Sequence, residues 1–315
     1  INALLKIAGK NPAQLVASDM GFSVAPRLNA AGRLDDISYG IQCLLTDDPV
    51  IALKHAQELE QFNQDRKTIE QEMQTEALKI VEDLVLADQD ELPAALCLYQ
   101  ADWHQGVVGL LASRIKEKFH RPVAVFARDD NGMLKGSVRS ISGLHIRDAL
   151  DAVATKNPGL INKFGGHAMA AGLSLEESFF DQFEQALQQQ VESTINPQDL
   201  EATLQTDGQL NIEQFSMHTA TLLRDAGPWG QAFPEPCFQG EFNLISQRIV
   251  GENHLKVTLS PDTANDTAMD GIYFNIDSEQ WPTTRTRVRC VYRLDINEFR
   301  GRESLQMIIQ YMEPL

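Results

Sequence analysis

The chain has little of what marks membrane, secreted or metal-binding proteins. Its 315 residues include four cysteines, Cys43, Cys97, Cys237 and Cys290, which are far apart. Without a Cys-x-x-Cys pair they favour buried thiols in a reducing cytoplasm over a zinc site or a disulfide framework. No apolar run could span a bilayer and no signal peptide is visible, so we expect a cytoplasmic protein without a membrane partner. The chain starts at Ile1 inside a helical pattern, which predicts a fragment of a longer polypeptide.

The common motifs of self-sufficient catalytic sites are also missing. There is no P-loop, no Gly-x-Ser-x-Gly and no His-Glu-x-x-His. The paired aspartates at 35–36, 47–48 and 129–130 have no histidines near them in sequence. A cluster holding two divalent metals is therefore not predicted, and we assign no metal ligand in this chain.

Positive charge is scarce, and one segment carries a local excess of it. The formal net charge is −17, which argues against a protein that coats nucleic acid indiscriminately. Between Trp103 and Ser174, however, the sequence has ten Lys and Arg residues and five Asp and Glu residues, a local excess of five positive charges. A local basic surface on an acidic body suits a phosphate ligand held at one place.

One long helix is predicted after the first 48 residues. Asp48 can cap it and Pro49 occupies its first position. No glycine or proline follows until Pro93, and apolar residues recur near heptad spacing around a polar middle at 64–67. We expect this helix, residues 49–92, to follow the tail of a preceding domain (1–48). It either connects two lobes or packs along one domain.

From Pro93 the sequence alternates between strand and helix patterns, which predicts an α/β domain over 93–196. We expect strands at 94–100, 122–127, 133–138 and 171–175. Helices are expected at 106–119, 145–155 and 178–193. The turn sequence Asp130-Asn131-Gly132 indicates a hairpin, and a glycine-rich loop around His167 is expected near 164–170.

A polar segment at 196–199 separates the α/β domain from a second predicted domain over 197–315, whose strand patterns are all-β. A helix at 212–224 and a Pro/Gly-rich segment at 227–236 come first. Strands are then expected at 237–250, 255–259, 269–274, 287–294 and 304–310. Five strands in about eighty residues fit an OB-type barrel, so the fold class is α/β followed by all-β.

Three short segments could carry chemistry. Ser137 and Arg139 share a face of an extended strand, and a hydroxyl beside a guanidinium is a good receptor for a terminal phosphate. His167 follows two glycines, where it could donate to a phosphate or shuttle a proton. The segment 26–33 has an arginine at each end of a small-residue run, which is plausible for a ligand-facing element. Taken singly, each also fits a solvated turn or strand end.

Other residues stay open between a structural and a functional role. Trp103 either stacks a base or, more in keeping with its position, seals the core, and His104 is ambiguous for the same reason. Arg114 and Lys118 share a helix face that fits plain solvated surface. An expected barrel strand carries a row of alternating arginines, Arg285, Arg287 and Arg289. This row either binds single-stranded DNA along the strand or is an ordinary exposed face of the sheet.

Taken together these segments resemble the RecJ family of single-strand-specific 5′→3′ DNA exonucleases, within the DHH phosphoesterase superfamily. Residues 26–33 look like its arginine-bearing motif, 136–140 like its Ser-x-Arg motif, and 164–172 like the signature of its DHH-associated domain. Further similar segments lie at 103–106, 225–230 and 295–301. The resemblance covers essentially the whole chain.

The resemblance implies a set of roles. Ser137 and Arg139 would seat the 5′ phosphate of single-stranded DNA, and His167 would lie by the scissile phosphate as the catalytic residue in this chain. The strand would be contacted by Arg27, Asn29, Arg33, Ser140, Gly165 and Gly166. The family's Mn or Mg ligands do not occur here, so we expect this fragment to bind a DNA end weakly and cleave nothing alone.

The family further implies a role in DNA repair and recombination, and a monomer. A single-strand-binding protein is a family-level expectation as partner. Two alternatives remain at this point. The first is a non-catalytic nucleic-acid or protein scaffold, and the second is a DHH-type phosphodiesterase acting on short nucleotides. The barrel and the long helix argue against the second alternative, because a dinucleotide needs no strand-guiding module.

Overall fold

The computed structural model describes residues 1–87, 92–230, 232–251, 253–261, 268–276, 280–299 and 301–315. The chain divides into two compact units. The first comprises residues 1–15 and 19–202, and the second 16–18 and 203–315. Within the described residues, no helix is both long enough and apolar enough to span a membrane.

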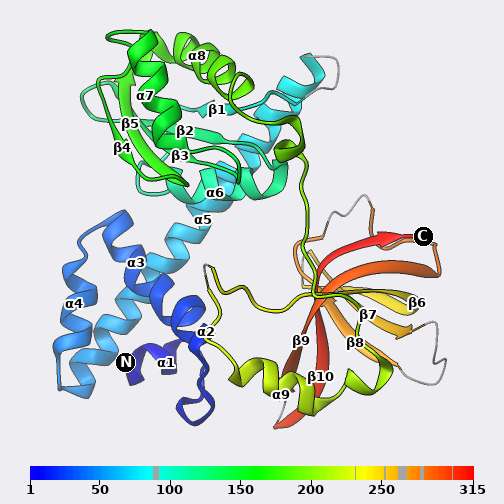
Figure 1. The fold of residues 1–315 in the computed structure, drawn as a ribbon. Helices are drawn as coiled ribbons and strands as arrows, with labels where there is room; N and C mark the ends of the chain where they lie inside the picture. Colours follow the sequence, from blue (N-terminus) through cyan, green and yellow to red (C-terminus); the bar gives the residue numbers. More distant parts are fainter. Residues whose placement is uncertain (88–91, 231, 252, 262–267, 277–279, 300) are drawn as a thin grey trace. The chain divides into compact units, whose positions relative to one another are not determined.

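The first unit begins with a small helical bundle built on a long helix (Figure 1). Helices α1 (Asn2–Ile7), α3 (Ala25–Leu34) and α4 (Ser38–Leu45) precede α5 (Pro49–Ala87), and the short α2 (Ala17–Asp19) has its first two residues in the second unit. Leu4, Leu5, Ala31 and Leu59 are among the buried residues that join α1, α3 and α5 in one core. This bundle fixes the position of α3 against the long helix.

Helix α5 begins as its sequence predicts. The Asp48 carboxylate accepts hydrogen bonds from the amides of Val50, at 2.8 Å, and Ile51, at 3.3 Å, and Pro49 is the first helical residue. These are the amides that a helix start leaves without an internal partner. The predicted end of the helix at 92 lies past residues 88–91, which are outside the described part of the chain.

A five-stranded sheet forms the centre of the α/β region. Its strands run in the order β1 (Leu96–Tyr99), β2 (Val123–Arg128), β3 (Met133–Arg139), β5 (Ala170–Glu176) and β4 (Lys163–Gly166). β1 and β2 are parallel, whereas the other neighbours are antiparallel. The predicted hairpin between β2 and β3 is confirmed, with Gly132 at a φ of +80°.

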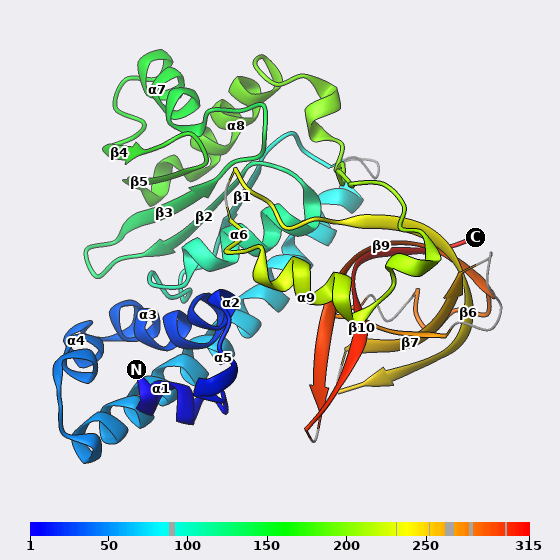
Figure 2. The ribbon, with the colours of Figure 1, turned by 60° about the horizontal axis from the view of Figure 1, so that its bottom comes forward.

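Helices cover both faces of this sheet (Figures 1 and 2). α6 (Val108–Phe119) and α5 bury one set of alternating strand residues, including Leu96, Leu98 and Val125. α7 (Ile146–Lys156) and α8 (Phe180–Glu192) bury the opposite set, including Cys97 and Phe126. The alternation follows from the two-residue period of a strand, so both faces of the sheet lie in apolar cores.

The second unit is a closed barrel preceded by a short helix, α9 (Met217–Asp225). Its strands close in the order β10-β8-β7-β6-β9. Their bounds are β6 (Phe238–Val250), β7 (His254–Pro261), β8 (Met269–Tyr273), β9 (Arg287–Phe299) and β10 (Arg302–Pro314). β8 and β10 are parallel and the other pairs antiparallel. The predicted OB-type barrel is confirmed.

Two local predictions were wrong, and residues 26–33 had no predicted secondary structure. These residues belong to α3, with Pro26 in its first turn, where proline is tolerated. The expected loop before His167 is instead strand β4, because its amides and carbonyls pair with β5. The helix expected at 212–224 breaks at Ser216, whose extended backbone and side chain cap α9.

Candidate nucleic-acid interface

Ser137 and Arg139 lie side by side at the end of β3. The Arg139 Nη1 donates to Ser137 Oγ and to the Val138 carbonyl, both at 2.9 Å. Burial lowers the pKa of Arg139, and the charge of Arg33 lowers it further. In the described part of the chain, no carboxylate forms an ion pair with Arg139. A half-buried guanidinium without a counter-charge is a favourable place for an anion.

Arg33 reaches the same place from the C-terminal turn of α3. Its Nη1 donates to the Gly106 carbonyl at 3.1 Å, and its backbone packs so closely that a Cβ on Gly106 would lie 2.0 Å from the Arg33 carbonyl oxygen. Only a residue without a side chain allows this approach. The loop before α6 therefore fixes Arg33 near Arg139.

The first turn of α6 completes this wall. A Cβ on Gly109 would lie 3.0 Å from an Arg139 Nη and 3.1 Å from Ser137 Oγ, so the strand end packs directly against the start of the helix. A helix N-terminus carries a partial positive charge and amides that face outward. It adds to the attraction that the two arginines exert on an anion.

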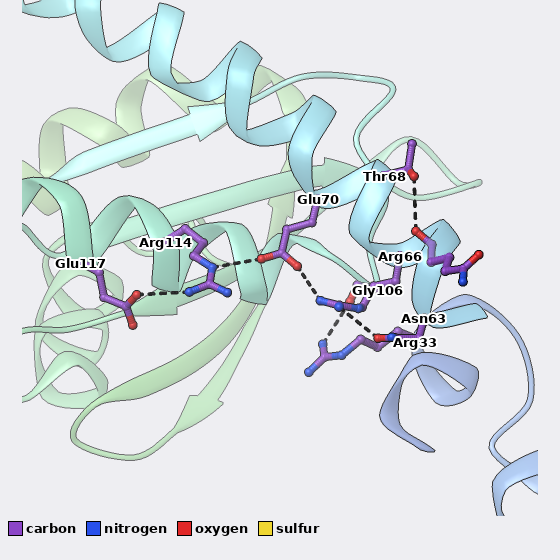
Figure 3. A network of polar contacts seen from close by, with 9 residues as sticks. Arg33, Asn63, Arg66, Thr68, Glu70, Gly106, Arg114 and Glu117 are labelled. Carbon is purple, nitrogen blue, oxygen red and sulfur yellow. Dashed lines mark hydrogen bonds and ion pairs between the residues drawn. The ribbon is translucent and has the colours of Figure 1, made fainter. Parts of the chain in front are cut away.

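A buried polar network in the middle of α5 supports Arg33 (Figure 3). Glu70 is 8% exposed and accepts from Arg66 Nη1 at 2.5 Å and from Arg114 Nε at 3.1 Å. Arg66 also donates to the buried Asn63 at 3.1 Å. Burial and the charge of Arg66 lower the pKa of Arg33, while Glu70 raises it. One carboxylate thus offsets repulsion among several guanidiniums.

The glycine-histidine segment lies at the same end of the sheet. In the β3–β5 register Arg139 is opposite Ala170, and the His167 amide donates to the Ala170 carbonyl at 2.8 Å. A Cβ on Gly166 would lie 2.4 Å from the Ala170 carbonyl oxygen, whereas one on Gly165 would meet nothing within 4 Å. Gly166 is needed for strand pairing, and Gly165 leaves an open surface beside the exposed His167.

The other predicted contacts are placed differently. Arg27 Nε lies 2.5 Å from Glu60 Oε2 on α5, and its Nη1 donates to the Ser23 carbonyl at 2.6 Å. Asn29 is exposed on α3. Ser140 is 1% exposed and donates to the Leu144 carbonyl at 2.8 Å. We therefore assign the Ser140 side chain to the turn and remove it from the proposed DNA contacts.

Sequence reasoning missed several parts of this surface. Gly106 and Gly109 follow Trp103 but were given no role, Arg66 was assigned to the polar middle of a helix, and Glu70 was not singled out. Trp103 itself is in the core, 4% exposed, and donates to Glu76 at 2.7 Å. The available signal was Glu70, a charged residue three positions before the apolar Met73 and thus on the same face of the helix.

The arginine row of the barrel has a different environment. Arg289 contacts Glu241 at 3.1 Å and Glu313 at 2.8 Å, and Arg287 contacts Glu241 at 3.1 Å. Arg285 precedes β9 and so does not alternate along the strand as expected. Carboxylates therefore compensate Arg287 and Arg289 on the barrel surface.

No metal site is formed by the residues that the structure describes. Among them, no group of three or more His, Cys, Asp or Glu side chains is arranged to hold an ion. The donor set present does not fit a divalent metal, which requires several oxygen or nitrogen ligands at one point. No reaction step through a metal follows from these residues.

Comparisons with known proteins agree with this architecture. The DHHA1 domain model matches residues 92–193, and the RecJ OB domain model matches 206–311. The fold thus defines a DHHA1 domain followed by a RecJ-type OB barrel. The whole chain is 52% identical to a single-stranded-DNA-specific exonuclease RecJ of Dickeya dadantii and 53% identical to that of Escherichia coli. The chain belongs to the RecJ family.

The chain matches only part of these proteins. It spans 54% of the length of the two curated relatives. A crystal structure of RecJ in complex with Mg²⁺ from Thermus thermophilus aligns with all of this chain, with a TM-score of 0.75 and 25% identity. This chain covers 46% of that one. A second structure from the same organism is in complex with Mn²⁺.

Proposed function

We propose that this chain is the substrate-binding half of a single-strand-specific DNA exonuclease that works from a 5′ end. Ser137, Arg139, Arg33 and the first turn of α6 hold the 5′ phosphate. The observation that carries the proposal is Arg139, a half-buried guanidinium hydrogen-bonded to Ser137 and, among the described residues, without a carboxylate in ion-pair contact. A phosphate supplies the missing negative charge and several acceptors.

The remaining residues have roles that follow from their positions. His167, exposed at the same end of the sheet as Arg139, lies by the scissile phosphate and stabilises charge there. Gly165 and Gly166 let the strand pass close to the backbone, and Arg27 and Asn29 on α3 contact it further along. Ser140 supports the turn between β3 and α7.

In the complete enzyme the hydrolysis uses Mg²⁺ or Mn²⁺, the ions found in the Thermus structures. The described residues do not provide ligands for such an ion, so we expect residues 1–315 alone to bind a DNA end and not to cleave it. We further propose that the enzyme acts in DNA repair and recombination, in the cytoplasm, as a monomer and with a single-strand-binding protein as partner.

Binding of the purified chain to single strands with a 5′ phosphate or a 5′ hydroxyl tests the phosphate site. Fluorescence anisotropy should show a preference of roughly 10- to 100-fold for the phosphorylated end, the range expected for charge-assisted hydrogen bonds. Arg139→Ala should remove this preference. Arg289→Ala, which removes a compensated guanidinium, is the matched control and should keep it.

Two results would contradict the proposal. One is equal affinity of the native chain for both ends. The other is an equal loss of affinity for both ends in Arg139→Ala, which would make Arg139 a general backbone contact. Robust metal-dependent cleavage by the purified chain would contradict the expected inactivity of residues 1–315.

A further inference from the structure

A cavity of about 340 Å³ lies in the second unit, between the segment that precedes α9 and strands β6 and β9. Leu210 and Phe215 line it from that segment, and Phe242, Arg289 and Tyr292 line it from the barrel. Its size is within the range of small-molecule sites, which favour β-barrels and clefts of mixed polarity. The phosphate site described above lies in the other unit and shares no residue with it.

Aromatic rings form one wall of the cavity. Phe215 stacks on Tyr292 with ring centroids 5.8 Å apart and an angle of 25° between the planes. Phe242 stands edge-on to both rings, at 6.2 Å from Phe215 and 5.6 Å from Tyr292. Phe215 is only partly buried. A planar ligand can therefore extend a stack that the protein has already begun.

One buried polar atom in this wall lacks a partner. Tyr292 is 0% exposed, and among the described residues its hydroxyl has no hydrogen-bond partner. A buried hydroxyl without a partner is costly, and native structures usually satisfy such groups. The hydroxyl is itself buried, so a ligand in the cavity does not reach it, and the Tyr292 ring serves as packing behind Phe215.

The charges around the cavity exclude a phosphate as its main ligand. Its one arginine, Arg289, contacts Glu241 and Glu313, so no uncompensated cation from the described residues faces it. Gln209 and Gln239 also line the cavity, and a glutamine amide offers a donor and an acceptor side by side. The surface therefore suits a neutral, planar ligand with hydrogen-bonding edges.

We propose that this cavity binds one unstacked nucleobase of the single strand. The base stacks against Phe215, and its edge pairs with the amides of Gln209 and Gln239. Stacking on an aromatic side chain together with amide contacts to the base edge is how unpaired nucleic acid is commonly held. This inference rests on the proposed function, because it takes single-stranded DNA as the ligand.

A titration with free nucleosides tests the cavity without any DNA end. Deoxyadenosine and thymidine are added to the ¹⁵N-labelled chain, and the side-chain amide signals are followed by NMR. We expect saturable shifts for Gln209 and Gln239 with at least one nucleoside, and none for Gln310, an exposed glutamine of β10 outside the cavity. Unchanged Gln209 and Gln239 signals with both nucleosides would overturn the proposal.

Variants in the complete chain then compare an ordinary single strand with one that carries an abasic tract, both 5′-phosphorylated. Phe215→Ala should bind the ordinary strand roughly 5- to 30-fold more weakly, as expected for the loss of one base stack. It should bind the abasic strand as the native chain does. Gln239→Ala, an exposed position that does not threaten folding, should shift affinity in the same sense, and Gln310→Ala should change neither.

The two proposals fail in different ways in this experiment. Phe215→Ala should keep the preference for a 5′ phosphate, whereas Arg139→Ala should lose it and keep the difference between ordinary and abasic strands. Equal effects of Phe215→Ala and Gln239→Ala on both strands would overturn the base site and leave the phosphate site intact. Should Phe215→Ala unfold, as judged by circular dichroism, Gln239→Ala decides.

Discussion

Two sets of arginines have different surroundings: Arg287 and Arg289 on strand β9, and Arg139 on strand β3 with Arg33 on helix α3. On the barrel, Arg287 and Arg289 contact Glu241 and Glu313 across neighbouring strands. In the α/β region, Arg139 has Ser137 and Arg33 beside it, and the described residues bring no carboxylate into ion-pair contact with it. The residue type is the same, yet one set is neutralised within the protein and the other is left for an anion from outside.

The two sets of arginines also differ in how deeply their side chains are buried. The side chains of Arg287 and Arg289 are 47% and 51% exposed, where water screens their charges and ion pairs contribute little. Burial lowers the pKa of Arg139, which shows that its charge is held at a cost in solvation. A protein tolerates such a cost where the charge serves binding, and this argument favours Arg139 over the barrel row as a phosphate contact.

The largest effect we predict compares two carboxylates that each serve two arginines. Glu70→Ala leaves the largely buried Arg66 without a carboxylate, while the half-exposed Arg114 keeps Glu117, and we expect a loss of about 3–5 kcal/mol in the free energy of unfolding. Glu241→Ala removes the corresponding carboxylate on the exposed barrel surface and should lose about 0–1 kcal/mol. Urea denaturation of both variants measures the difference, and equal losses would remove the distinction between the two networks.

A second prediction tests the close approach that fixes Arg33. Gly106→Ala forces the loop away from the Arg33 carbonyl, because the new Cβ would lie 2.0 Å from it, and should lose about 1–3 kcal/mol of stability. It should also weaken the preference for a 5′ phosphate, since Arg33 then moves relative to Arg139.

Gly21→Ala, outside the proposed DNA surface, is the matched control for this glycine. A Cβ there meets nothing within 4 Å, so stability should change by no more than about 0.5 kcal/mol. Thermal unfolding and anisotropy are measured on both variants. An unchanged phosphate preference in a folded Gly106→Ala chain would show that the position of Arg33 is not required.

The smallest effect concerns salt. If Arg139 neutralises one phosphate of the strand, Arg139→Ala should reduce the slope of log affinity against log salt by about 0.7. Arg289→Ala should leave the slope unchanged, because its charge is already compensated by Glu241 and Glu313. The slopes are obtained by measuring the affinity of both variants for the single strand between low and moderate salt. An equal change in both slopes would contradict the distinction between the two sets of arginines.

Much of the fold could be predicted because it depends on local patterns. The start of α5 at Asp48 and Pro49 is a matter of backbone amides and one carboxylate. The β2–β3 hairpin follows from Asn131 and Gly132, and the alternation of strand and helix over 93–196 predicts the layered sheet. The break at Ser216 was missed, because a single serine in a helical pattern only weakly indicates a new cap.

The candidate site could be predicted in part. The sequence singled out Ser137, Arg139 and the segment around His167, and the β3–β5 register brings them to one end of the sheet. Ser140 was included because it follows Arg139, but its side chain faces inward. Nothing in the spacing of Gly106 from Arg33 indicates that they touch, since contacts between distant segments have no local signal.

The two classes of domain, most of the elements and the residues suited to contact a phosphate could be predicted without the structure. These depend on the periodicity of apolar side chains and on the chemistry of single residues. Which arginines are already paired with carboxylates could not be predicted without the folded structure. Charge compensation depends on distances between side chains that are far apart in the chain, such as Arg289 and Glu241, and folding alone sets those distances.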